Sequence, residues 1–184
     1  MVALQTIAHV VNAIDLLAVL SVAGVPVAYK PYDWLSISVN PLSVPPAFAA
    51  GTLLMVLGTL IRLVSYKHLG RYFTFQLSIR KGHQLVTSGP YSIVRHPSYT
   101  GAWICMIGIA ISQLAPGSLY SELGLWRNPL GFVAGAFQLV FVVYTGLTIH
   151  LRVQKEDAAL HTEFRDEWVA WVSRTPCRLV PGFY

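Results

Sequence analysis

Charge is what this sequence has least of. Only 11% of its 184 residues are Asp, Glu, Lys or Arg, whereas 54% are apolar, and the mean hydropathy is +0.55. Because a soluble globular domain carries about 25% charged residues, this shortage excludes an ordinary water-soluble domain. The composition instead predicts an integral membrane protein.

Cysteine is also scarce, with Cys105 in an apolar segment and Cys177 near the C-terminus. Two thiols so placed do not form a disulfide framework. The six histidines show no metal-ligand spacing such as His-x-x-x-His, so we expect no metal site. The net charge of +5 is spread over several loops, which argues against nucleic-acid binding.

Long charge-free segments are what the chain does have. They cover residues 3–28, interrupted by Asp15, and residues 44–61, 99–115 and 129–149. About 20 apolar residues span a bilayer, so the first and last segments are long enough and the other two need their flanks. The sequence therefore predicts an all-α polytopic protein of about four membrane helices, forming one domain over residues 1–184. Asp15 is expected to be a structural hydrogen-bonding residue.

Basic residues set the predicted orientation. The loop between the second and third segments and the C-terminal tail together hold Arg62, Lys67, Arg71, Arg80, Lys81, Arg95, Arg152, Lys155, Arg165, Arg174 and Arg178. The other two connections hold only Lys30 and Arg127. By the positive-inside rule, the basic loop, the tail and both termini are cytosolic.

The segment 89–101 combines Pro90 and Pro97 with Arg95, His96 and two tyrosines, directly before an apolar run. Pro is favoured at the first position of a helix, so each proline is expected to start one. Helix starts offer backbone N–H groups to anions. The segment therefore predicts a ligand-binding loop at the membrane boundary.

The C-terminal part has the pattern of an amphipathic helix that continues from the fourth segment and stops before Pro176. Its apolar residues are expected to serve packing; they are Leu160, Phe164, Trp168 and Trp171. Near its start, Arg152 and Glu156 stand four residues apart and share a face. They are either a surface ion pair or part of a site at the same interface.

Three groups of residues resemble the isoprenylcysteine carboxyl methyltransferase family, membrane enzymes that methylate the C-terminal carboxylate of prenylated proteins with S-adenosylmethionine. The first is His-Gln-Leu-Val-Thr-Ser-Gly-Pro-Tyr at 83–91, and the second is Arg-His-Pro-Ser-Tyr-Thr-Gly at 95–101. The third comprises Arg152, Glu156, Asp157, Leu160, Phe164, Trp168, Arg174, Pro176 and Pro181. Asp157 and the two tryptophans depart from the residues common in the family.

The resemblance implies a site for S-adenosylmethionine. Its expected cofactor-binding residues are Gln76, His83, Gln84, Leu85, Val86, Tyr91, His96, Pro97, Ser98, Tyr99 and Glu156. Arg152 is the expected catalytic and substrate-binding residue. The resemblance also implies prenylated protein C-termini or prenylcysteine lipids as partners, without metal or nucleic acid. It implies a multi-pass protein of the endoplasmic reticulum membrane, with an active site facing the cytosol.

The residue types suit this chemistry. A C-terminal carboxylate is already ionised at neutral pH, so it needs alignment by Arg152 rather than a base. His96 is accordingly expected to bind rather than to catalyse. The alternatives are methylation of a phospholipid amine or another lipophilic acceptor, a sterol reductase with a nicotinamide cofactor, and a small membrane scaffold or transport protein.

Overall fold

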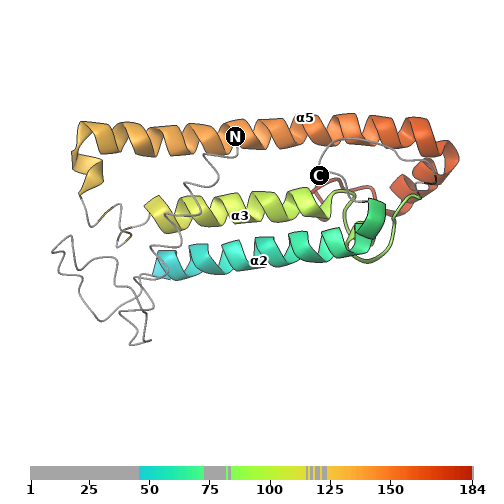
Figure 1. Ribbon diagram of the computed structural model, residues 1–184, viewed down its shortest axis with the longest axis horizontal. Coiled ribbons are helices and arrows are strands. Elements are labelled where there is room, and N and C mark those ends of the chain that lie inside the picture. The colour runs from blue at the N-terminus through green and yellow to red at the C-terminus, as the bar shows by residue number, and fades with distance from the viewer. Residues whose placement is uncertain are drawn as a thin grey trace. The chain divides into compact units, whose positions relative to one another are not determined.

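Helices make up the regular structure of the chain. The computed structural model describes residues 46–72, 82, 84–114, 116, 118, 121 and 124–183, and these contain no strand. Its elements are α2 (Pro46–Leu69), η1 (Gly70–Tyr72), η2 (Gly89–Ser92), α3 (Pro97–Leu114), η3 (Leu125–Arg127) and α5 (Pro129–Arg174), as Figure 1 shows. The predicted all-α class is confirmed for this part of the chain. The first predicted span, with Asp15, lies outside the described residues.

Two of the described helices are long and apolar enough to cross a membrane, namely the segments Pro46–Tyr72 and Pro129–Arg174. They contain the second and fourth apolar segments. The third segment is helical as α3, but this 18-residue helix does not meet the same test. The four-span topology therefore stays a prediction.

Helix α2 is longer than the apolar segment that predicted it. The charge-free segment ends at Ile61 because Arg62 follows, and the helix runs on to Leu69, in line with the expectation that this segment needs its flanks. Arg62 Nη2 donates a hydrogen bond of 2.6 Å to the hydroxyl of Tyr66, one turn further along. The guanidinium also lies 5.5 Å from the centroid of that ring, a cation–π distance. The helix thus supplies its own partner for the charge and does not end there.

The chain divides into two compact units, Met1–Leu53 with Gly108–Leu139, and Leu54–Ile107 with Val140–Tyr184. Glycines bring α2 and α3 into backbone contact within each. In the first unit, a Cβ added to Gly51 would lie 2.7 Å from the carbonyl oxygen of Gly108. In the second, a Cβ added to Gly58 would lie 2.5 Å from that of Gly101. No side chain fits at these positions without separating the helices.

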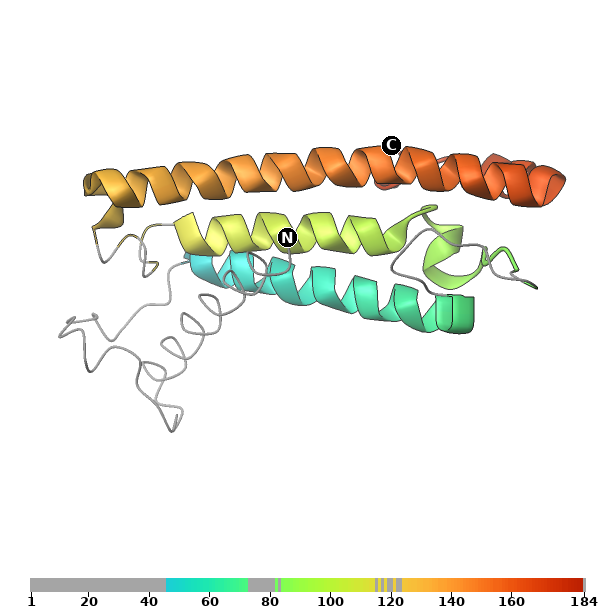
Figure 2. The same ribbon diagram turned by 45° about the horizontal axis from the view of Figure 1, so that its top comes forward.

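In the second unit, α3 lies between α2 and α5 (Figures 1 and 2). Its core is a small apolar cluster on α3, α5 and the C-terminal segment, formed by Ala102, Ile149, Val153 and Leu179. Tyr99, Trp103 and Met106 of α3 pack against this cluster. The packing anchors the start of α3, where the sequence motif lies, to the charged half of α5.

Helix α5 is interrupted at Arg165, which the sequence pattern does not predict. This residue has φ 41° and ψ −107°, a conformation that side chains disfavour. Beyond it the helix continues to Arg174 and ends before Pro176, as predicted. The interruption redirects the last turns so that Trp171 is buried, and its Nε1 donates a 3.0 Å hydrogen bond to the carbonyl of Tyr91. The expected packing role of Trp171 is confirmed.

Candidate functional site

The segment before α3 is held in place by a segment about 80 residues further along. The backbone N–H groups of Arg95 and His96 donate to the carbonyls of Cys177 and Arg178, at 3.0 and 2.9 Å. Arg95 Nη1 also donates to the carbonyl of Thr175, at 3.0 Å. These contacts position His96, at the start of α3, against the C-terminal segment.

A buried carboxylate, Asp157 on α5, joins the same two segments. Its Oδ2 accepts hydrogen bonds from Arg95 Nη2 and Arg178 Nε, both at 3.1 Å. Its Oδ1 lies 2.9 Å from His96 Nε2. Burial disfavours the charge of Asp157, but the hydrogen bonds and charges of His96 and Arg95 outweigh burial and hold its pKa below the usual value. Asp157 is therefore an ionised carboxylate.

Five residues predicted for the site lie together; we call them the Glu156 cluster. They are Tyr91, His96, Tyr99, Arg152 and Glu156. Glu156 Oε2 lies 3.8 Å from His96 Nδ1, and both Glu156 and Arg152 interact with the Tyr99 hydroxyl. The guanidinium of Arg152 is 5.9 Å from the centroid of the Tyr99 ring. The cluster thus combines a guanidinium, a carboxylate, an imidazole and two phenols.

Two polar atoms of the cluster are buried without a hydrogen-bond partner in the part of the chain that the structure describes: the Tyr91 hydroxyl and Glu156 Oε2. Burial first, and then the negative charge of Glu156, raise the pKa of Tyr91 well above its usual value, so the phenol keeps its proton. A buried polar group without a partner costs about 1–3 kcal/mol. Such atoms mark a place where the polar groups of a ligand would be stabilising.

Pro90 and Pro97 do start helices: Pro90 lies in the first turn of η2, and α3 begins at Pro97. We expected these helix starts to offer free backbone N–H groups to an anion. That expectation is wrong for most of the N–H groups in the two turns, because they already donate within the chain. The N–H groups already bonded within the chain are those of Tyr91, Ile93, Val94, Tyr99 and Thr100. Side chains, rather than the two helix starts, are what the loop presents to a ligand.

The remaining predicted residues lie in the segment that precedes η2, in the first turn of α3 or outside the described residues. Gln84 is exposed, and its Oε1 accepts a 3.2 Å hydrogen bond from the Tyr72 hydroxyl. Leu85 and Val86 are half-buried in the extended segment that follows. Pro97 and Ser98 form the first turn of α3, next to His96. Gln76 and His83 lie outside the described residues.

Sequence reasoning missed the support behind the cluster, which is formed by Arg95, Asp157 and Arg178. The sequence identifies Arg95 as a basic residue of the predicted binding loop, Asp157 as a departure from the family motif and Arg178 as a basic residue of the tail, and it does not predict that the three meet. A signal was present: charged residues are rare in this chain, and a buried charge requires partners. Which charges become buried depends on the C-terminal segment folding back, and this is not visible in the local sequence.

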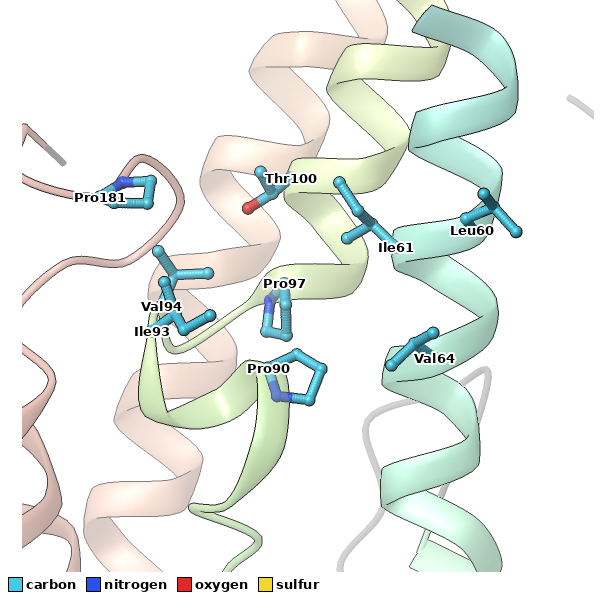
Figure 3. Close-up of a pocket in the computed structure, with 9 residues that line it drawn as sticks. All are labelled: Leu60, Ile61, Val64, Pro90, Ile93, Val94, Pro97, Thr100 and Pro181. Carbon is cyan, nitrogen blue, oxygen red and sulfur yellow. The ribbon is translucent and has the colours of Figure 1, made fainter. Parts of the chain in front are cut away.

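An apolar cavity of about 390 Å³ lies on the α2 side of the loop (Figure 3). Ile61 and Val64 of α2 line it on one side, and Pro90 and Pro97 of the loop line it on the other. Pro90 and Pro97 each adjoin a residue of the Glu156 cluster in the sequence. The same loop thus contributes polar groups to the cluster and an apolar wall to this cavity.

Comparisons with known proteins show which family the sequence resembles. A model described as the isoprenylcysteine carboxyl methyltransferase (ICMT) family matches residues 51–118. Protein-S-isoprenylcysteine O-methyltransferase B of Arabidopsis thaliana is 29% identical over 128 residues, which are 68% of this chain and 55% of that protein. Protein-S-isoprenylcysteine O-methyltransferase of Rattus norvegicus is 37% identical over 83 residues, which are 43% of this chain and 29% of that protein.

A Delta(14)-sterol reductase of Neurospora crassa is also similar, at 27% identity over 124 residues, which are 59% of this chain and 25% of that protein. No solved structure matches the chain. The chain spans about half of the Arabidopsis protein and smaller shares of the other two. The resemblance to the isoprenylcysteine carboxyl methyltransferase family that the motifs predicted is confirmed by the family match and by these relatives.

Proposed function

We propose that the protein transfers a methyl group from S-adenosylmethionine to the C-terminal carboxylate of a prenylated cysteine. The observation that carries the proposal is the Glu156 cluster, in which Arg152 stands beside two buried polar atoms that have no hydrogen-bond partner among the described residues. Relatives named protein-S-isoprenylcysteine O-methyltransferase give independent support. Prenylated protein C-termini or prenylcysteine lipids are the proposed partners.

Arg152 is the proposed contact for the acceptor. A C-terminal carboxylate, with a pKa of about 3.5, is ionised at neutral pH and needs no base. A guanidinium can hold it by two parallel hydrogen bonds and stays charged in a partly apolar setting. Arg152 is exposed at the edge of the cluster, close to the Tyr99 ring, which limits the directions its side chain can take. Orientation of the acceptor would supply most of the acceleration.

The residues present fit the methyl donor. S-adenosylmethionine supplies an electrophilic methyl on a positively charged sulfur, and it also carries an ammonium and several hydroxyl groups. Glu156 Oε2 can accept from such donors, and the Tyr91 hydroxyl can donate to or accept from them. Gln76, His83, Gln84, Leu85, Val86, Pro97, Ser98 and Tyr99 remain proposed cofactor-binding residues on the strength of the sequence motif.

The proposed location is the endoplasmic reticulum membrane, with the site facing the cytosol. Large apolar side chains are exposed along α2 and the first half of α5, among them Leu53, Leu60, Leu130 and Val140. Such surfaces suit lipid rather than water. The basic residues adjoining these helices favour the cytosolic side for the cluster.

An amine acceptor is less compatible with this site, because Arg152 would repel an ammonium and the amine would have to lose a proton. A sterol reductase activity has one specific observation in its favour, the similarity to the Neurospora protein. It would require a nicotinamide cofactor instead of an adenosyl methyl donor. The two readings therefore differ in the ligand that the site should recognise.

In the deciding experiment, the purified full chain is incubated with S-adenosylmethionine that carries a labelled methyl group. The acceptor is N-acetyl-farnesylcysteine, its geranylgeranyl analogue or phosphatidylethanolamine, each in a separate reaction. We expect base-labile label, characteristic of a methyl ester, on one or both prenylcysteines and none on the amine lipid. Methylation of the amine lipid alone would overturn the proposal. A rise in melting temperature with NADPH but not with S-adenosylmethionine would favour the reductase.

A further inference from the structure

The imidazole of His96 lies between two carboxylates that are adjacent in sequence on α5. Its Nε2 is 2.9 Å from Asp157 Oδ1, and its Nδ1 is 3.8 Å from Glu156 Oε2. The side chain is only 5% exposed. Arg95 and Arg178 reach the group through Asp157, and the Tyr99 ring centroid lies 5.9 Å from that of His96.

The partners of Asp157 decide which nitrogen of His96 carries the proton. Two guanidinium groups donate to Asp157 Oδ2, so Asp157 is ionised and can only accept hydrogen bonds. His96 Nε2 must then be the donor. In a neutral imidazole the second nitrogen, Nδ1, consequently has no proton and is an acceptor.

With the imidazole in this neutral form, His96 Nδ1 and Glu156 Oε2 are two acceptors that face each other, and they cannot bond to one another. Glu156 Oε2 is buried and has no hydrogen-bond partner among the described residues. An ammonium group has three donors and one positive charge, and its hydrogen bonds are about 2.9 Å long. Two acceptors 3.8 Å apart are close enough to share it. A hydroxyl, with a single donor, would satisfy only one of them.

We propose that Asp157 is a positioning residue that keeps the proton of His96 on Nε2, so that His96 Nδ1 and Glu156 Oε2 together bind the ammonium group of the methyl donor. This inference rests on the proposed function and adds to it the part of the ligand recognised and the residue that prepares the site. Asp157 itself acts through His96 and does not contact the ligand.

The first test reads the proton directly and needs no ligand. Nitrogen-15 NMR of histidine-labelled full chain in detergent micelles at pH 9 distinguishes the two ring nitrogens, and His96→Gln identifies the signals. We expect a proton on Nε2 and none on Nδ1. A proton on Nδ1 in the wild type would overturn the inference, whatever the variants do.

The second test uses Asp157→Asn. Arg95 and Arg178 would retain the amide oxygen, which turns the amide NH₂ toward His96 Nε2 and moves the ring proton to Nδ1. We expect the wild type to bind S-adenosylhomocysteine at least tenfold more tightly than its analogue without the amino group, measured by calorimetry. Asp157→Asn should bind both ligands equally, whereas Asp166→Asn, an exposed carboxylate on the same helix, should keep the preference.

The outcomes separate this inference from the proposed function. A tenfold preference that survives in Asp157→Asn would overturn the role of Asp157. Asp157→Glu keeps a carboxylate and should restore part of the preference, which a purely structural defect would not predict. If the wild type prefers the ligand that has the amino group but transfers no methyl group to any prenylcysteine, the proposed function is contradicted and the role of Asp157 is not.

Discussion

At the scale of single residues, two neighbouring turns of α5 have different proposed roles: one carries the residue that binds the acceptor, and the other carries a residue that holds the cluster in place. Arg152 is exposed at the edge of the Glu156 cluster, whereas Asp157 is buried with two arginines and His96 as partners. An exposed guanidinium beside the Tyr99 ring can be reached by an incoming carboxylate. A buried carboxylate with three partners keeps one arrangement and fixes the groups around it.

Arg152→Lys should reduce methyl transfer to N-acetyl-farnesylcysteine strongly although it retains the charge, because Lys cannot form the planar two-point contact. Arg152→Ala should lose more. Removing one partner of a hydrogen-bonded charge pair costs about 2–5 kcal/mol, so kcat/KM should fall by roughly 30-fold or more. The measurement is steady-state kinetics beside calorimetric cofactor binding, which should change little.

Lys155→Ala is the matched control for Arg152, because Lys155 is an exposed cation on the same helix. It should retain near-normal turnover. Near-normal turnover in Arg152→Ala would contradict the assignment of Arg152. A gain of activity on an amine lipid in that variant would instead favour amine methylation.

At this scale the sequence predicted the members of the cluster better than their surroundings. Tyr91, His96 and Tyr99 share a short motif, and Arg152 and Glu156 share a helix face, so local spacing was enough to associate them. The role of Arg95 depends on carbonyls about 80 residues away, and no local pattern contains that information.

At the scale of elements, the contact between α2 and α3 depends on glycines, which have no side chain to separate the two backbones. Gly58 and Gly101 let the backbones of α2 and α3 meet within the second unit. The start of α3 carries the cluster residues His96 and Tyr99. The distance between these two helices therefore influences where the cluster residues stand.

Gly58→Ala should lower the melting temperature of the protein in detergent, because the new methyl would lie 2.5 Å from the Gly101 carbonyl oxygen. Overpacking of this kind costs about 1–3 kcal/mol. Leu57→Ala, at an exposed neighbouring position on α2, is the control and should change the melting temperature less. Equal melting temperatures for Gly58→Ala and the wild type would show that the helices can separate without cost.

Arg165→Gly should raise the melting temperature. Glycine adopts positive φ without the strain that a side chain imposes, and the expected gain is of the order of 1 kcal/mol. Thr162→Gly, in the regular helix one turn earlier, should have the opposite effect because glycine is unfavourable there. A destabilised Arg165→Gly protein would mean that the side chain of Arg165 contributes more than its backbone strain costs.

The sequence predicted that α3 begins at Pro97, and the fourth apolar segment begins where α5 does, at Pro129. It did not predict what stabilises Arg62 within α2 or the interruption at Arg165. In both cases a tertiary or local contact decides the outcome: Tyr66 satisfies the guanidinium, and Trp171 is buried beyond the break. Apolar periodicity does not record either contact.

At the scale of the whole molecule, orientation in the membrane decides whether the proposed site can meet cytosolic cofactor. In a protein without its two native cysteines, Lys81→Cys should react with an impermeant thiol reagent from the cytosolic side only. Arg127→Cys should react only from the opposite side. The physical reason is the excess of basic residues in the loop and tail, and sealed microsomes with and without permeabilisation provide the measurement.

The reverse labelling pattern would place the Glu156 cluster away from the cytosol and would contradict the predicted topology. Labelling of both positions from one side would mean that the chain between them crosses the membrane an even number of times, or not at all. The number of crossings was only partly predictable from sequence. Two described helices meet the length and hydropathy requirement, while α3 owes its place to packing against α2 and α5 as much as to its own hydropathy.

The backbone bonds from Arg95 and His96 to residues 177 and 178 have a consequence for synthesis. A ribosome makes the loop well before it makes its partner, so the nascent chain holds an incomplete loop while more than 75 further residues are added. During that interval Arg95 lacks the carbonyls of residues 175 and 176, and Asp157, once it has been made, lacks Arg178. The binding loop is therefore completed only once this late segment has left the ribosome, and until then any chaperone or translocon that shields its unpaired charges is acting on an unfinished protein.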